Sequence, residues 1–118
     1  MPLVPVSDDT LEEEVLGAPG VVALLFGAVW DAPSVLAHRV LSDLAWRVSA
    51  RLCYLDVGGD QSVAALYRVR ELPTVLFFRD GGIVGKLVGR KNAAHYLLAL
   101  DTAAVAPWGA GGLMSETG

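Results

Sequence analysis

Two kinds of hydrophobic pattern alternate along the chain and predict its strands and helices. Nearly continuous apolar runs at 21–27 and 52–57 are typical of strands buried on both faces of a sheet. Between these runs, apolar residues recur every four positions from Leu36 to Val48 and predict an amphipathic helix from Pro33 to about Ser49. A short apolar stretch at 3–6 predicts a first strand. Two more strands, at 72–79 and 83–89, are joined by "D-G-G", a strong hairpin signal.

Polar residues mark where the remaining helices begin. The stretch "S-D-D-T-L-E-E-E-V-L" (7–16) predicts a first helix in which Thr10 and Glu13 form a capping box. Residues 62–67 predict a short helix, and Asn92 can cap a last helix that runs through about Ala104. The resulting order, β-α-β-α-β-α-β-β-α, predicts an α/β three-layer sandwich with a mixed sheet and helices on both faces. Right-handed crossovers make its first three strands parallel.

Composition and charge limit the classes of protein to which the chain can belong. Its 118 residues suffice for one domain, assigned to 1–104, and the Gly-rich end without periodicity predicts a flexible tail at 105–118. Hydrophobic residues make up 53% of the chain, which predicts a well-filled core and an apolar face for a partner. A net charge of −4, with scattered basic residues, argues against nucleic-acid binding. The longest apolar run, 21–30, is too short for a bilayer, which needs about 20 residues.

Cysteine use points to an intracellular protein without a metal site. Cys53 is the one cysteine, so no internal disulfide and no C-x-x-C metal spacing is possible. A lone cysteine in an apolar strand is usually a small buried hydrophobic residue. The N-terminus lacks the basic region of a secretory signal, and we therefore predict a cytoplasmic location. Abundant alanine and the preference for arginine over lysine suggest a GC-rich bacterial genome.

Several motifs are similar to those of the thioredoxin family. "A-V-W-D-A-P-S" (28–34) stands where the family has W-C-G-P-C. "Y-R-V-R-E-L-P-T-V-L-F-F-R-D-G" (67–81) follows the family pattern Y-x-I-x-x-x-P-T-x-x-x-F-x-x-G. Gly89 stands at the glycine of the loop that faces the family's site. The chain thus resembles thioredoxin from about Leu3 to Ala104.

The resemblance implies a shallow binding groove beside the 30–34 turn. It implies that the Leu72–Pro73 bond is cis, and that Leu72 pairs through its backbone with an extended substrate segment. The residues expected to form the groove are Trp30, Asp31, Ala32, Pro33, Ser34, Leu72, Pro73 and Gly89.

The chain departs from the family where the redox chemistry takes place. Asp31 and Ser34 occupy the two cysteine positions, so thiol–disulfide exchange lacks both its nucleophile and its resolving thiol. By the resemblance, the family's buried acid falls at Leu25 and the neighbouring lysine at Tyr54. The turn therefore lacks the sulfur atoms and also the groups that move the resolving thiol's proton.

Other chemistry at this turn has to be weighed against simple helix capping. Asp31 can cap the following helix, a contribution of about 1 kcal/mol, and a recognition or catalytic role is the alternative. Ser34 and His38 are four residues apart and could form a nucleophile–base pair, which would still need an orienting acid. A metal site formed by Asp31, His38 and His95 lacks any known ligand spacing. For Trp46 the expectation is core packing, with partner contact as the alternative.

From these observations we expect a redox-inactive thioredoxin-like protein, not an enzyme. It would hold extended segments of a protein partner noncovalently, as a chaperone, adaptor or assembly factor. The alternative is an enzyme with non-thiol chemistry at Asp31 and Ser34. We expect no cofactor, no metal, no membrane or nucleic-acid contact, and a monomer or weak dimer.

Overall fold

A single mixed sheet organises residues 3–106, the part of the chain that the structure, a computed structural model, describes. Its strands are β1 (Val4–Pro5), β2 (Val21–Gly27), β3 (Arg51–Asp56), β4 (Thr74–Arg79) and β5 (Gly82–Val88). They lie in the order β1-β3-β2-β4-β5. β1, β3 and β2 are parallel, whereas β4 and β5 are antiparallel to their neighbours. The predicted α/β sandwich with a mixed sheet is confirmed.

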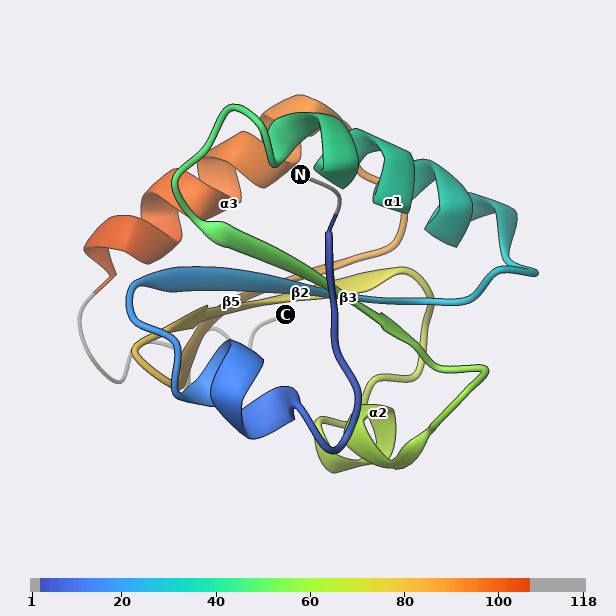
Figure 1. Cartoon of the computed structure of the whole chain (residues 1–118). Coiled ribbons are helices and arrows are strands. Elements are labelled where there is room, and N and C mark those ends of the chain that lie inside the picture. The colour runs from blue at the N-terminus through green and yellow to red at the C-terminus, as the bar shows by residue number, and fades with distance from the viewer. Residues whose placement is uncertain (1–2, 107–118) are drawn as a thin grey trace.

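Helices cover both faces of this sheet (Figure 1). α1 (Ala32–Leu44) and α3 (Ala93–Val105) lie on one face, and η1 (Glu12–Leu16) and α2 (Ser62–Leu66) lie on the other. Each face has its own hydrophobic core because side chains alternate along a strand. In β2, Leu24 and Phe26 join the η1 and α2 core, while Leu25 joins the α1 and α3 core. Burial on both faces explains the continuous apolar sequence of the central strands.

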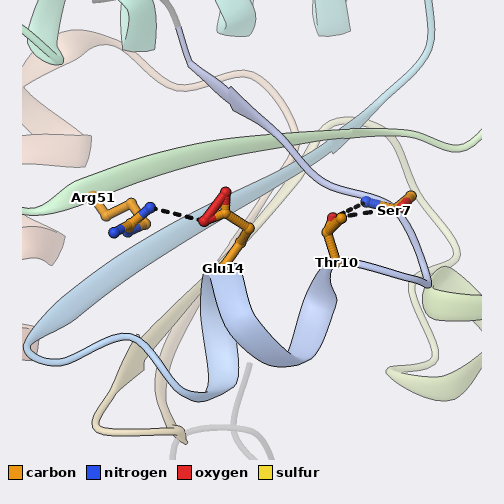
Figure 2. Close-up of polar contacts among 4 residues, drawn as sticks. All are labelled: Ser7, Thr10, Glu14 and Arg51. Carbon is orange, nitrogen blue, oxygen red and sulfur yellow. Dashed lines mark hydrogen bonds and ion pairs between the residues drawn. The ribbon is translucent and has the colours of Figure 1, made fainter.

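The first helix differs from its prediction. Residues 12–16 form one π-helical turn that has no side-chain cap, so the predicted Thr10–Glu13 capping box is wrong. The reason is a competing local bond, because the Thr10 hydroxyl oxygen accepts from the Ser7 backbone N–H at 3.0 Å. Glu14 instead pairs with Arg51 at 3.1 Å and joins η1 to β3 (Figure 2). Both side chains are partly exposed, so this pair contributes little to stability.

The helix predicted at 33–49 is shorter than its apolar pattern. α1 ends at Leu44, and the Arg47 N–H donates to the Leu44 carbonyl at 2.8 Å in the turn that follows. Trp46 comes after the end of the helix and is 74% exposed, so the prediction that it packs in the core is wrong. Once the helix has ended, the four-residue spacing no longer holds the side chains on one face.

The remaining elements lie close to their predictions. β4 begins at Thr74 rather than at 72, because Pro73 has no N–H to donate to the sheet. Asp80 and Gly81 have positive φ angles in the β4–β5 hairpin, as the "D-G-G" signal predicts. Asn92 caps α3, which extends one residue past Ala104, whereas residues 107–118 of the predicted tail lie outside the described residues. No helix within 3–106 is long and apolar enough to cross a membrane.

Candidate functional site

The registers of β2, β4 and β5 bring the predicted site residues to one end of the sheet. Phe26, near the end of β2, pairs with Thr74 at the start of β4, and Thr74 pairs with Val88 at the end of β5. The 28–34 turn follows β2, the Leu72–Pro73 step precedes β4, and Gly89 follows β5. Three segments that are far apart in the sequence therefore meet at this end.

Asp31 and Ser34 form one hydrogen-bonded unit at the start of α1. Asp31 is the N-cap of α1, as the sequence predicts. Its Oδ2 atom accepts from the Ser34 backbone N–H at 3.0 Å and from the Ser34 hydroxyl at 2.7 Å. Ser34 is buried against Gly27, where an added Cβ would lie 3.0 Å from the Ser34 Cβ. Ser34 thus faces the interior of the turn, not the surface of the proposed groove.

Trp30 lies across Gly58 and forms one wall of a surface hollow. A Cβ at Gly58 would come within 2.8 Å of the indole Cη2 atom, so only glycine fits beneath this ring. The ring is nevertheless 68% exposed. We call the adjoining hollow of about 360 Å³ the Trp30 hollow; its lining is Trp30, Val57, Gln61, Ala64, Ala65, Val69, Arg70 and Leu72. Trp30 and Leu72, which are 42 residues apart in the sequence, thus share one surface.

The rest of the predicted groove lies beside this hollow. The Leu72–Pro73 peptide bond is cis, as the resemblance implies, and Pro73 is buried. The Gly89 N–H donates to the Pro73 carbonyl at 2.8 Å, and the positive φ of Gly89, 85°, explains the glycine. Ala32 is exposed and Pro33 is partly buried in the first turn of α1.

Beneath the turn lie Leu25 and Tyr54, the positions at which the resemblance implies the family's acid and lysine. Leu25 is fully buried and pairs with Tyr54 across β2 and β3. Burial raises the pKa of the Tyr54 hydroxyl. The Tyr54 and His38 rings make an edge-to-face contact, with their centroids 4.8 Å apart. His38 lies near the Ser42 hydroxyl at 3.4 Å. The Ser34 hydroxyl bonds to Asp31 instead, so a hydrogen-bonded Ser34–His38 pair is not formed.

Cys53 cannot replace the missing dithiol. It lies in the centre of β3 and is 1% exposed, which confirms the prediction of a buried hydrophobic residue. Burial raises the pKa of its thiol to about 12, so the reactive thiolate is not populated at neutral pH.

His95, Asp56 and Asp60 make short-range hydrogen bonds to nearby backbone N–H groups. His95 is exposed and completes the capping box of α3, where its Nδ1 accepts from the Asn92 N–H at 3.2 Å. Asp56 and Asp60 each accept one bond from a backbone N–H two residues ahead. That bond, from Ser62, lowers the pKa of the Asp60 carboxyl. Within residues 3–106, no group of three metal-ligating side chains comes together.

Two features of the site have no clear signal in the sequence. Gly58 directly follows the apolar run at 52–57 in the sequence, but in the structure the Trp30 ring lies against it. Arg70 follows α2 and lines the Trp30 hollow together with Trp30. Both contacts join segments distant in sequence, so neither periodicity nor a local motif could reveal them.

The sheet order, the cis-proline step and the turn before α1 define a thioredoxin fold, and the solved structures agree. A mutant thioredoxin from Halobacterium salinarum superposes with a TM-score of 0.80 at 28% identity, covering 88% of this chain and 93% of that one. No family model matches the sequence.

Similar proteins show the family. Thioredoxin from Pseudomonas aeruginosa is 30% identical over 84% of this chain and 94% of its own length. The Mycolicibacterium smegmatis thioredoxin is 32% identical over 85% of this chain and 93% of its own length. A Staphylococcus aureus thioredoxin is 35% identical over 82% of this chain and 96% of its own length. This chain belongs to the thioredoxin family.

The relatives correct the function expected from the sequence. Proteins that are 30–35% identical over most of the chain are named thioredoxins, and none of these names indicates a chaperone, an adaptor or an assembly factor. The expectation of a redox-inactive protein of that kind is therefore wrong, together with its alternative of non-thiol enzyme chemistry. The absence of sulfur from residues 30–34 remains a fact of the sequence that any function has to accommodate.

Proposed function

We propose that this chain acts in the thiol–disulfide chemistry of proteins, as the name of its relatives indicates, through sulfur atoms that belong to a cytoplasmic protein partner. The chain engages a cysteine-bearing part of that partner at Trp30, Leu72, Pro73 and Gly89. In the exchange, a cysteine thiol of the partner loses its proton and attacks a disulfide of the same partner. One S–S bond breaks as another forms, and the leaving thiolate takes up the proton that the attacking thiol gave up. The 30–34 turn contributes no electron to this exchange, because it holds no sulfur.

The closed Asp31–Ser34 unit carries this proposal. Free N–H groups at the start of a helix stabilise a thiolate and lower its pKa. Here the Ser34 N–H is already bonded to a carboxylate, and that carboxylate would raise the pKa of a neighbouring thiol. The turn thus favours an uncharged thiol or a disulfide over a thiolate at this point. The buried Cys53 supplies no substitute, because its pKa is about 12.

The Trp30 hollow supplies the surface for engagement. Exposed tryptophans are frequent anchors of binding energy, and Trp30 stands beside a hollow that Leu72 also lines. Its ring rests on Gly58 rather than in a core, so its large exposed area stays available. Asp31, Ala32 and Pro33 follow Trp30 directly in the sequence.

A peptide titration tests this function. The probe is a synthetic eight-residue peptide with one central cysteine, joined by a disulfide to a second copy, and its control has serine in place of cysteine. Nuclear magnetic resonance should show changes in the amide chemical shifts of Trp30, Leu72 and Gly89. These changes should be larger with the disulfide peptide than with the serine peptide. Mass spectrometry should show no mixed disulfide with the chain.

Two tryptophan variants provide matched controls. Trp30→Ala should weaken binding about tenfold or more, whereas Trp46→Ala, which removes a similarly exposed ring after α1, should not. Equal binding of the cysteine and serine peptides, or shifts confined to other parts of the surface, would contradict the proposal. A mixed disulfide with Cys53 would contradict the claim that the chain supplies no sulfur.

A further inference from the structure

A second hollow beside the site is lined by basic side chains. It has a volume of about 320 Å³ and is formed by Arg68, Arg70, Glu71, Thr74, Lys86 and Val88; we call it the basic hollow. Its three cations face one carboxylate, although the chain as a whole has a net charge of −4. Within residues 3–106, none of the three forms an ion pair, since the single pair found there joins Arg51 and Glu14. Three positive charges are therefore concentrated in the basic hollow without a salt bridge among residues 3–106.

The basic hollow adjoins the Trp30 hollow. Arg70, in the segment after α2, lines both of them. Thr74 and Val88 pair at the site end of β4 and β5, next to Pro73 and Gly89. A polypeptide bound against Trp30 and Leu72 could thus continue into the basic hollow without leaving the surface.

Arg68 holds a position that normally suits glycine. It follows α2 with a φ of 57°, in the left-handed region. The Val69 N–H donates to the Ala64 carbonyl at 2.8 Å, and the Arg68 N–H donates to the Ala65 carbonyl at 3.1 Å. This is the helix-end motif in which glycine is the usual residue. The fold alone gives no reason for arginine here, whereas a guanidinium at the rim of the basic hollow does.

Protection of the sheet edge explains only part of this cluster. Lysine on an edge strand prevents pairing with other chains, and β5 is an edge strand of this sheet. That accounts for Lys86. Arg68 and Arg70 lie outside the strands, so edge protection does not account for them.

We propose that the basic hollow binds acidic side chains of the same polypeptide that engages the Trp30 hollow, so this inference rests on the proposed function. Arginine guanidinium groups bind carboxylates through paired hydrogen bonds, and Lys86 adds a third positive charge. Charge complementarity selects the occupant as an acidic polypeptide segment. The three cationic side chains are exposed or partly exposed, so salt must weaken the attraction.

Three fluorescent peptides test the inference. They share one cysteine-bearing core, which carries four glutamates at its N-terminal end, four glutamates at its C-terminal end, or four serines at each end. Fluorescence anisotropy gives their affinities in 50 mM and 300 mM NaCl. One of the acidic peptides should bind about fivefold or more tightly than the serine peptide in low salt. The preference should shrink in high salt.

Two double variants locate the preference. Arg68→Gly with Arg70→Ser should abolish it, and Arg39→Ser with Arg47→Ser, which removes the same charge from exposed sites at α1 and the turn after it, should leave it largely unchanged. Since glycine suits position 68, the first variant should melt no lower than the parent, which separates lost binding from lost fold.

The outcomes separate the two proposals. If the serine peptide binds at Trp30 and neither acidic peptide binds more tightly, the basic hollow has no such role and the proposed function stands. If both double variants weaken the preference equally, only net charge is sensed, and the inference is overturned. If no peptide binds, the proposed function fails and the inference fails with it.

Discussion

Asp31 and Ser34 show how two neighbouring residues can take over a helix terminus that a dithiol family uses for chemistry. One carboxylate oxygen accepts two hydrogen bonds, from the backbone and from the side chain of Ser34. The positive end of α1 is therefore neutralised by a group that belongs to the chain itself. Both residues act first as structural elements of α1, and this determines what substitution should do.

Removal of the Asp31 carboxylate should destabilise the protein. Asp31→Ala should lower the free energy of unfolding by about 1 kcal/mol, because an N-cap acceptor is lost, and Asp31→Asn should lower it much less, because asparagine also caps helices well. Urea unfolding followed by circular dichroism measures both. If the alanine variant unfolds at the same urea concentration as the parent, the cap contributes nothing and Asp31 is kept for another reason.

At the residue scale, the features of the site that could be predicted are those set by neighbouring residues in the sequence. The Asp31 cap was predictable, because a cap depends on residues within one helical turn. The seat of Trp30 on Gly58 depends on a contact between residues 28 positions apart, which no local pattern encodes. Burial of Ser34 could not be foreseen either, since it follows from the close approach of Gly27.

Among the helices, α3 has one buried polar atom without a partner. Tyr96 is fully buried in the core between α3 and the sheet, and its hydroxyl has no hydrogen-bond partner among residues 3–106. Burial also raises the pKa of this hydroxyl. An unsatisfied buried hydroxyl opposes folding by about 1–3 kcal/mol.

Tyr96→Phe should accordingly stabilise the protein. The phenyl ring keeps the packing of α3, so the free energy of unfolding should rise by about 1 kcal/mol. Tyr67→Phe is the matched control, since Tyr67 is only partly buried and water can reach its surroundings, and it should change stability little. Thermal melting of both variants checks this. A lower melting temperature for Tyr96→Phe would mean that the hydroxyl has a partner after all.

At the element scale, the number, kind and order of strands and helices were predictable, and their ends were less so. Nearly continuous apolar runs predicted the central strands, because these strands are buried on both faces of the sheet. The end of α1 could not be placed from its apolar spacing, because the spacing continues past Leu44 while the backbone turns. The capping box predicted for the first helix is absent because the Thr10 hydroxyl accepts from the Ser7 N–H, and no pattern at 7–16 indicated the π-helical turn of η1.

Across the whole molecule, the absence of the two cysteines goes together with the absence of the acid and the lysine that the resemblance implies beneath the turn. Leu25 and Tyr54 pair in the sheet beneath the turn, where by the resemblance the family has an acid and a lysine. New thiols at the turn would thus lack a group to move their protons. The whole site, not two positions, differs from that of a dithiol thioredoxin.

Restoring the cysteines alone should give only feeble activity. The variant with Asp31→Cys and Ser34→Cys should reduce insulin disulfides far more slowly than a dithiol thioredoxin, and the parent should show no turnover. Adding Leu25→Asp and Tyr54→Lys should raise the rate, with circular dichroism to verify folding. Full activity of the two-cysteine variant would show that Leu25 and Tyr54 do not limit the reaction.

The oxygen atoms of Asp31 and Ser34 have a consequence for how the protein experiences its surroundings. A dithiol turn exists in two forms, and the surface that it offers changes when oxidants convert one form into the other. Carboxylate and hydroxyl groups undergo no such conversion, and the thiol of Cys53 is shielded inside the sheet. The surface at the 30–34 turn of this chain therefore keeps its shape and charge under oxidising conditions, whereas a turn that carries a dithiol does not.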